Sequence, residues 1–192
     1  MIYIGKLQKA VNFAIKVHEV DQKQKRKGKD VAYISHPLAV GLILSRTGAD
    51  EDVVVAGILH DTVEDSIEEK RVTPEILKEE FGERVADIVM SITEDKGFAW
   101  GERKQKALEE IKEFSNDSLL LKSADLISNV SEIVDDYGRD GYKDFEGFSA
   151  PEPKKENTIR HYSNVMNAIL TVWPENPLKE DLLFLSEKLI KI

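Results

Sequence analysis

The sequence places acidic and imidazole side chains directly after an apolar segment. The run Val53–Leu59 is apolar, and His60 and Asp61 follow it at once, with Glu64 and Asp65 shortly after. Unpaired charges taken out of water cost several kcal/mol, so this cluster predicts a compensating partner. On a helix, these side chains would occupy two adjacent faces and reach one region. Three carboxylates packed together repel one another, and a divalent cation relieves this repulsion.

Two residues elsewhere in the chain are candidates for the same cation. His36 stands at the entry to an otherwise apolar segment, and Asp125 comes soon after the run Leu119–Leu121. With His60 and Asp61 they would supply two nitrogen and two oxygen ligands. This mixed set suits Mn²⁺, Fe²⁺, Co²⁺ or Zn²⁺ better than Mg²⁺ or Ca²⁺. Four protein ligands on an octahedral ion leave two positions for water or a substrate oxygen, as metal-assisted hydrolysis requires.

Each candidate ligand also has an ordinary structural explanation when it is taken alone. His36 could bond to backbone at the start of a helix, and His60 could be a core histidine with its hydrogen bonds satisfied. Asp125 could pair with Lys122, one helical turn earlier. The metal hypothesis is favoured because all three explanations would have to hold together and would still leave the carboxylate cluster unexplained.

Helical periodicity dominates the chain and predicts an all-α fold. Apolar residues recur at three- and four-residue steps from Leu7 to Val17, Pro37 suits the first turn of a helix, and Thr73 suits the N-cap of a short helix to about residue 80. His18 and His161 fall on ordinary amphipathic helices and are interpreted as structural. Further helices are predicted over 51–65, 83–92, 102–114, 117–137, 153–173 and 179–191. We expect one domain over residues 1–192, a bundle of about eight to ten helices with the C-terminal helix packed on the rest.

Loops are predicted over residues 23–32, 95–101 and 138–153. The last contains Tyr142, Phe145 and Phe148 among glycines and prolines, which predicts that it packs against the protein rather than forming a free linker.

A short basic stretch, KQKRKGK over residues 23–29, stands out in an otherwise acidic chain. It could receive a small, highly charged anion, although a solvated lysine-rich loop would have the same composition. The net charge of −9 argues against general binding to nucleic acid, which needs an excess of lysine and arginine.

Composition predicts a globular protein of the cytoplasm. The hydrophobic fraction is 41%, and no apolar run approaches the roughly 20 residues that cross a bilayer. The N-terminal residues lack the layout of a secretion signal, and membrane association is not expected. The absence of cysteine excludes thiolate metal sites, disulfides and cysteine nucleophiles. The oligomeric state is left open.

Several segments resemble the HD phosphohydrolase superfamily, and within it the hydrolase domains of RelA/SpoT-type proteins and the stand-alone small alarmone hydrolases. Residues 59–66, LHDTVEDS, contain the HDxxED motif of that family in full, and residues 122–129, KSADLISN, resemble its KxADxxxN motif. The resemblance covers about residues 5–170. The other similar segments are residues 24–28 with 33–37, which correspond to a basic loop and a first histidine, residues 81–85 and residues 102–104.

The resemblance implies a helical HD-type fold and a divalent metal, usually Mn²⁺. It implies removal of the 3′-pyrophosphate from guanosine tetra- or pentaphosphate alarmones, which are small phosphorylated nucleotides. Carried over by position, Glu64 and Asp65 would position or activate the attacking water. The implied metal ligands are His36, His60, Asp61 and Asp125. The implied substrate contacts are Arg26, Lys27, Arg103, Lys104 and Asn129.

The sequence departs from the family pattern at three positions. Leu126 and Ser128 stand where the family often has a basic residue and a histidine, and Ala32 stands where it often has proline. The changes at Leu126 and Ser128 motivate a second hypothesis, an HD-type nucleotidase or phosphatase for another phosphorylated metabolite. A third hypothesis is a nucleotide-binding sensor that no longer hydrolyses, against which the intact metal set and the pair Glu64 and Asp65 count.

Overall fold

The computed structural model describes residues 5–192, apart from the side chains of Asp140, Tyr142, Lys143 and Asp144. These residues form two compact units, which are described separately. The first unit comprises the chain to Arg26 and Asp30–Glu94, and the second comprises Lys27–Lys29 and Asp95–Ile192. Within residues 5–192 the regular elements are helical, and extended pairing is limited to a single bridge between residues 25 and 32. The predicted all-α class is confirmed, and the single domain over residues 1–192 stays a prediction.

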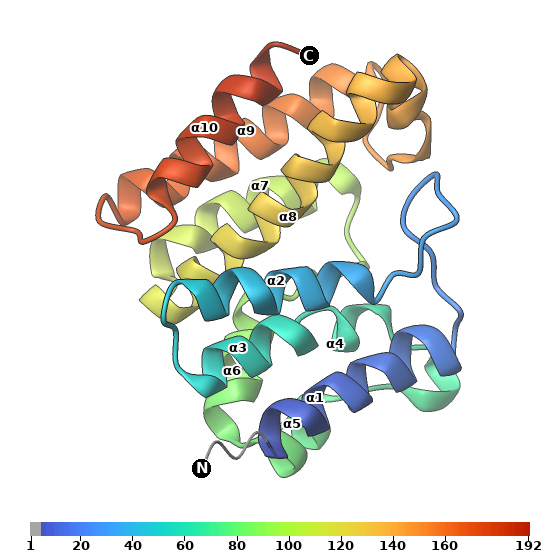
Figure 1. Ribbon diagram of the computed structural model, residues 1–192, viewed down its shortest axis with the longest axis vertical. Helices are drawn as coiled ribbons and strands as arrows, with labels where there is room; N and C mark the ends of the chain where they lie inside the picture. The colour runs from blue at the N-terminus through green and yellow to red at the C-terminus, as the bar shows by residue number, and fades with distance from the viewer. Residues whose placement is uncertain (1–4) are drawn as a thin grey trace. The chain divides into compact units, whose positions relative to one another are not determined.

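The helices of both units are labelled in Figure 1. Ten α-helices within residues 5–192 agree with the predicted eight to ten. The first unit contains α1 (Gly5–Ile15), a π-helical turn (Lys16–Val20), α2 (Ser35–Arg46), α3 (Glu51–Leu59), α4 (Thr62–Asp65), a 3₁₀ turn (Glu68–Lys70), α5 (Pro74–Phe81) and α6 (Glu83–Ile92). The second contains α7 (Trp100–Glu110), a 3₁₀ turn (Ile111–Glu113), α8 (Asn116–Asp140), a 3₁₀ turn (Gly141–Gly147), α9 (Lys154–Val172) and α10 (Lys179–Ile190).

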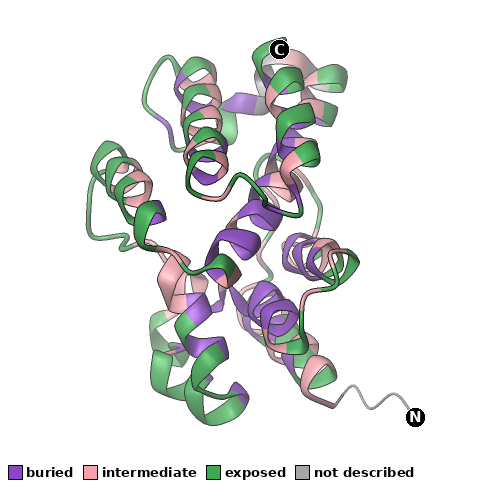
Figure 2. Cartoon of the chain, turned by 90° about the vertical axis from the view of Figure 1, so that its left-hand side faces the viewer, coloured by how far each residue is buried: buried purple, intermediate pink, exposed green. Residues whose placement is uncertain are grey.

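The first unit is built around α3, which packs against α1, α2 and α6. Every residue from Val53 to Leu59 is buried, as expected of a helix covered on several sides. The carboxylate of Asp50 caps its first turn by accepting from the backbone N–H groups of Asp52 and Val53. Most other helices carry buried residues on one side and exposed residues on the other (Figure 2).

The helix predicted over residues 51–65 is interrupted, which corrects the sequence interpretation. α3 ends at Leu59 and α4 begins at Thr62, so His60 and Asp61 lie in the turn between them. The Thr62 hydroxyl donates a hydrogen bond of 2.7 Å to the Leu59 carbonyl, and such local bonds compete with the helical pattern. The interruption places both functional candidates at a helix end instead of on a continuous face.

Helices α2 and α3 approach closely because each presents a glycine to the other. A Cβ atom built on Gly57 would lie 2.4 Å from Leu44 Cδ1, and one built on Gly41 would lie 2.7 Å from Ile58 Cγ1. Neither glycine has the positive φ angle that would itself require glycine. Their role is therefore steric, and the close contact positions His36 on α2 near His60 at the end of α3.

Gly57→Val is expected to lower the free energy of unfolding by about 1–3 kcal/mol, because its methyl groups cannot enter this contact without displacing Leu44. Chemical denaturation followed by circular dichroism measures the effect. Gly138→Val is the matched control, since a Cβ at Gly138 in α8 meets no atom within 4 Å. Equal stability of the two variants would contradict the steric role of Gly57.

The second unit consists mainly of α8, α9 and α10, which contact one another (Figure 1). Their shared core includes the fully buried Phe145, Met166, Ile169, Leu182 and Leu189. No helix within residues 5–192 combines the length and the apolar character needed to span a bilayer.

The loop predicted over residues 138–153 is partly helical. α8 continues to Asp140, past Gly138, and a 3₁₀ turn follows to Gly147. A glycine inside a helix costs only about 1 kcal/mol relative to alanine, so it does not by itself end a long helix. The predicted packing of this segment is confirmed for Phe145, whose ring centroid lies 5.6 Å from that of Phe148. The side chain of Tyr142 lies outside the described residues.

Candidate metal centre and active site

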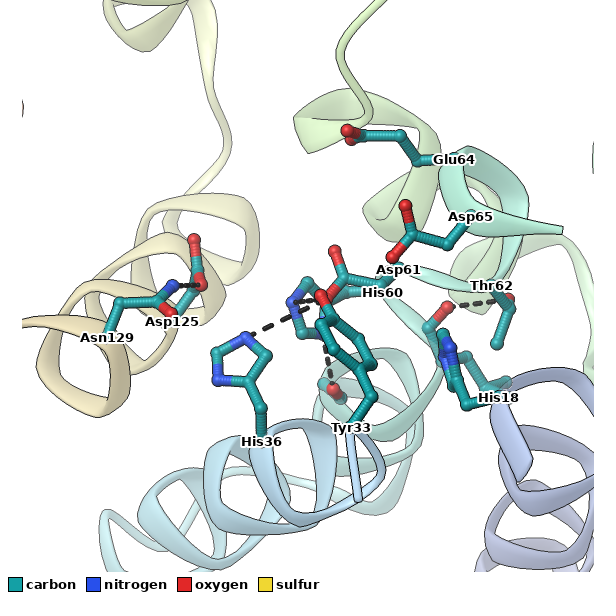
Figure 3. Close-up of polar contacts among 12 residues, drawn as sticks. His18, Tyr33, His36, His60, Asp61, Thr62, Glu64, Asp65, Asp125 and Asn129 are labelled. Carbon is teal, nitrogen blue, oxygen red and sulfur yellow. Dashed lines mark hydrogen bonds and ion pairs between the residues drawn. The ribbon is translucent and has the colours of Figure 1, made fainter. Parts of the chain in front are cut away.

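Three of the predicted metal ligands meet at one carboxylate oxygen in the first unit (Figure 3). His60 Nε2 lies 3.1 Å from Asp61 Oδ2, and His36 Nε2 lies 3.7 Å from the same oxygen. One ring nitrogen of each histidine lies within 4.8 Å of the other. Both histidines are buried, so this group is screened from bulk water. The sequence prediction that His36 lies beside the pair His60 and Asp61 agrees with this geometry.

The protonation of His60 makes this group a fitting site for a cation. In the neutral imidazole, the Nδ1 N–H donates to the Gly57 carbonyl oxygen 2.9 Å away, and Nε2 carries a lone pair. This nitrogen lies 3.1 Å from Asp61 Oδ2, and two acceptors at that distance repel each other. A divalent cation would relieve this repulsion, and the hydrogen bond to Gly57 holds the ring in one orientation. The residues present therefore fit a divalent metal.

Tyr33 is a member of the site that the sequence interpretation did not single out. Its hydroxyl donates a hydrogen bond of 2.5 Å to Asp61 Oδ2, and its ring lies 6.0 Å from the ring of His36. Burial raises the pKa of the Tyr33 phenol well above its usual range, and the negative charges of Asp61 and Asp65 raise it further. The phenol therefore stays neutral and acts as a donor. The spacing of three residues between Tyr33 and His36 was the available signal for this contact.

Tyr33→Phe is expected to weaken metal binding by roughly 10- to 100-fold, because Asp61 loses the donor that orients its carboxylate. Mn²⁺ titration in competition with a chelator measures the change. Tyr137→Phe in α8 removes a hydroxyl that accepts from Lys155 and serves as the control. Unchanged Mn²⁺ affinity in Tyr33→Phe would show that this hydrogen bond does not support the ligand.

Asp125 lies on α8 in the second unit and is 7% exposed. Its Oδ2 accepts from Lys122 Nζ at 2.9 Å, so the pairing considered as a structural alternative is present. Its Oδ1 accepts from Asn129 Nδ2 at 2.6 Å, one helical turn later. Two donors thus fix a buried carboxylate, as metal ligands require. Membership of Asp125 in the metal site stays a prediction, as does the contact of Asn129 with substrate.

Glu64 and Asp65, the predicted catalytic carboxylates, are each held by an amide N–H. Glu64 Oε2 accepts from the backbone N–H of Glu94 at 3.3 Å. Asp65 Oδ2 accepts from the side-chain amide of Gln24 at 2.9 Å. A neutral donor orients a carboxylate oxygen without removing its charge. The arrangement is compatible with a role in proton transfer.

Arg26 is the predicted substrate contact that lies in the first unit, which also contains His36, His60 and Asp61. Its guanidinium lies 5.4 Å from the centroid of the Tyr33 ring, and Tyr33 in turn donates to Asp61. Stacking on an aromatic ring restricts the guanidinium and leaves its forked donors suited to phosphate.

The rest of the basic stretch is mixed, since Lys23, Lys25 and Lys27 are exposed, as in the solvated loop considered above, and Lys29 is half-buried. Lys29 forms ion pairs with Glu132 and with the buried Asp136, within the second unit. Lys27 Nζ lies 5.1 Å from the centroid of the Phe148 ring. Composition identified the stretch as basic but could not predict which of its charges have acidic partners.

Arg103 and Lys104 lie on α7 in the second unit and are half-buried. Their predicted contact with substrate phosphate stays a prediction.

Comparisons with known proteins identify relatives in both sequence and structure. The model of the HD domain family matches residues 10–137. Guanosine-3′,5′-bis(diphosphate) 3′-pyrophosphohydrolase MESH1 of Danio rerio is 36% identical over 129 residues, which cover 66% of this chain and 68% of the relative. A second relative is the guanosine-3′,5′-bis(diphosphate) 3′-pyrophosphohydrolase of Aquifex aeolicus. It is 44% identical over 87 residues, which are 45% of this chain and 11% of that longer protein.

Among solved structures, a metazoan ortholog of SpoT superimposes with a TM-score of 0.79 at 22% identity, covering 98% of this chain and 97% of that one. A protein of Listeria monocytogenes gives a TM-score of 0.71 at 30% identity, covering 82% and 99% of the two chains. These likenesses support the HD-type fold. The chain therefore belongs to the HD-domain family, in the branch that contains these relatives.

Proposed function

We propose that this protein is a metal-dependent hydrolase that removes the 3′-pyrophosphate from guanosine 3′,5′-bis(diphosphate)-type alarmones. One observation carries the proposal. His36, His60 and Asp61 meet at a single oxygen beside an intact HDxxED motif, in a chain that is 36% identical to a guanosine-3′,5′-bis(diphosphate) 3′-pyrophosphohydrolase. In this proposal residues 1–192 form one domain, the protein acts in the cytoplasm, and its substrate is a small phosphorylated nucleotide.

The proposed ligands of the metal are His36, His60, Asp61 and Asp125. The contacts of the first three at Asp61 Oδ2 support this set, as does the burial of Asp125 between two donors. We further propose Mn²⁺ as the ion, because two nitrogen and two oxygen ligands favour a transition metal over Mg²⁺ or Ca²⁺. When bound, the metal would supply a water of lowered pKa and offset phosphate charge.

The side chains around the ligands then have distinct roles. Glu64 and Asp65 orient the attacking water, and Glu64 takes its proton as the bond to phosphorus forms. The P–O bond to the ribose 3′-oxygen breaks, and the proton that Glu64 took from water passes to that oxygen, so the products are pyrophosphate and a 3′-hydroxyl nucleotide. Arg26, already placed on Tyr33, binds phosphate through its paired donors. The remaining proposed substrate contacts are Lys27, Arg103, Lys104 and Asn129.

Hydrolysis of a different phosphorylated nucleotide is the second candidate function. It was motivated by Leu126 and Ser128, which depart from the family pattern. Leu126 is 1% exposed and belongs to the hydrophobic core of the second unit, so it contacts apolar neighbours and not a ligand. The case for another substrate thus depends on Ser128, which is half-buried on α8.

Pyrophosphate release from a nucleotide panel tests the proposal. The purified protein with Mn²⁺ should release pyrophosphate from guanosine 3′,5′-bis(diphosphate) faster than phosphate from GTP, GDP or guanosine 3′-monophosphate. An inert alarmone beside a fast alternative nucleotide would establish the second function. Tight nucleotide binding without turnover in metal-loaded protein would instead indicate a sensor.

A further inference from the structure

His18 is a buried histidine for which the proposed mechanism has no role. It lies on the π-helical turn Lys16–Val20 that follows α1, and its side chain is inaccessible to solvent. The sequence interpretation placed it on an ordinary amphipathic helix, which the structure corrects. π-helical turns occur mostly as short insertions and are frequent at functional sites. The His18 side chain, labelled in Figure 3, lies near Tyr33, with 5.0 Å between the two ring centroids.

A chain of two hydrogen bonds connects His18 to Asp65. His18 Nδ1 lies 2.8 Å from Gln24 Oε1, and Gln24 Nε2 lies 2.9 Å from Asp65 Oδ2. An ionised carboxylate only accepts, so the amide N–H₂ of Gln24 must face Asp65 and its oxygen must face His18. His18 Nδ1 must then carry the proton and donate. The charge on Asp65 thereby determines both the amide orientation and the imidazole tautomer.

The backbone holds Gln24 in place for this connection. Its N–H donates to the His18 carbonyl at 2.8 Å, and its carbonyl accepts from the Tyr33 N–H at 2.9 Å. The preceding residue, Lys23, has a φ of 51°, in the left-handed region that non-glycine residues rarely adopt. Such conformations persist where the surrounding contacts impose them. The loop is therefore shaped to direct the Gln24 side chain between His18 and Asp65.

The second nitrogen of His18 argues against a purely structural role. Nε2 is buried and has no hydrogen-bond partner among the described residues. Burying a polar atom without a hydrogen-bond partner is energetically unfavourable. The His18 ring packs against Tyr33, with 5.0 Å between their centroids, and an apolar ring of the same size would make this contact without that cost. The feature that distinguishes the imidazole from an apolar ring is therefore its N–H donor at Nδ1, which faces Gln24.

We infer that His18 is a positioning residue, which fixes the carboxylate of Asp65 toward the attacking water by orienting the amide of Gln24. The inference rests on the proposed role of Asp65 in hydrolysis. His18 itself touches neither water nor substrate. A rotating Asp65 would spend only part of its time in the productive orientation, so loss of the chain lowers the rate of the chemical step more than substrate affinity.

Two substitutions at His18 separate positioning from packing. His18→Phe keeps the ring volume and removes the donor, so kcat should fall by about tenfold with KM and Mn²⁺ content nearly unchanged. His18→Asn places an amide N–H near the position of Nδ1 and should restore most of the lost kcat. His161→Phe, on α9, is the matched control and should behave as the unmodified protein. If His18→Phe retains full kcat, or if Asn fails to rescue a folded protein, the inference is overturned.

Gln24→Leu provides a second route should His18→Phe fail to fold. It removes both hydrogen bonds and should lower kcat to the same extent as His18→Phe. Because both changes interrupt one chain, the double variant should be no slower than either single variant. Additive losses would show that the two residues act independently and would contradict the inference.

Nitrogen-15 NMR of the imidazoles tests the chain without any activity measurement. In the unmodified protein, His18 should carry a proton on Nδ1, and Gln24→Leu should abolish that preference. A proton on Nε2 in the unmodified protein would overturn the inference even if the enzyme is active. Conversely, a protein with the expected tautomer that leaves every nucleotide of the panel intact would contradict the proposed function and leave the hydrogen-bond chain established.

Discussion

Asp61→Asn is expected to abolish metal binding and turnover together. The contacts of His36, His60 and Tyr33 converge on Asp61 Oδ2, so this group shares a negatively charged oxygen. Asparagine keeps the size of the side chain and an acceptor for Tyr33, and it removes the negative charge that offsets a cation. Activity should fall by at least roughly 10³-fold, equivalent to about 4 kcal/mol of transition-state stabilisation.

Metal analysis of the dialysed protein and a pyrophosphate-release assay measure the two losses. Asp87→Asn, at an exposed position of α6 in the same unit, removes the same charge away from the site and should leave both unchanged. Thermal unfolding provides an additional test, because added Mn²⁺ should raise the melting temperature of the unmodified protein and not that of Asp61→Asn. A variant that binds stoichiometric Mn²⁺ and stays active would remove Asp61 from the ligand set.

Most helices could be predicted because each buries one face, and that face has a period of 3.6 residues in the sequence. Thr73 illustrates the local signals, since its hydroxyl accepts from the N–H of Ile76 as an N-cap should. The break between α3 and α4 could not be predicted in the same way. The apolar pattern continues to Leu59, and the interruption depends on a hydroxyl of Thr62 that a continuous helix would also accommodate.

The proposed histidine and aspartate ligands could be singled out from the sequence because polar residues at the ends of apolar segments need partners. Tyr33, His18 and Gln24 carry no such signal. Neutral side chains are common on amphipathic helices and in loops, and their hydrogen bonds join residues up to 41 positions apart in sequence. Only the folded backbone shows that Gln24 reaches Asp65. The same reason explains why the basic stretch could be recognised from composition while the partners of Lys29 could not.

Glu64→Gln should separate chemistry from metal binding. The structure places Glu64 on α4, where its Oε2 accepts from the backbone N–H of Glu94 at 3.3 Å. Glutamine retains an oxygen for that contact, so the fold and the ligands His36, His60 and Asp61 should be preserved. It cannot take a proton from water. General-base catalysis contributes about 10²- to 10⁴-fold to enzymatic rates, so kcat should fall within that range while Mn²⁺ binding stays intact.

The contrast with Asp61→Asn makes this measurement decisive for the roles of the two carboxylates. If both act as ligands, both substitutions should lower metal content, and added Mn²⁺ should restore part of the activity in each. If Glu64 is the base, excess Mn²⁺ should leave the defect of Glu64→Gln unchanged. Glu68→Gln, exposed on the adjacent 3₁₀ turn, tests for nonspecific effects of losing an acidic charge nearby. Near-full kcat in Glu64→Gln would exclude Glu64 as the proton acceptor and assign that step to Asp65, the carboxylate held by Gln24.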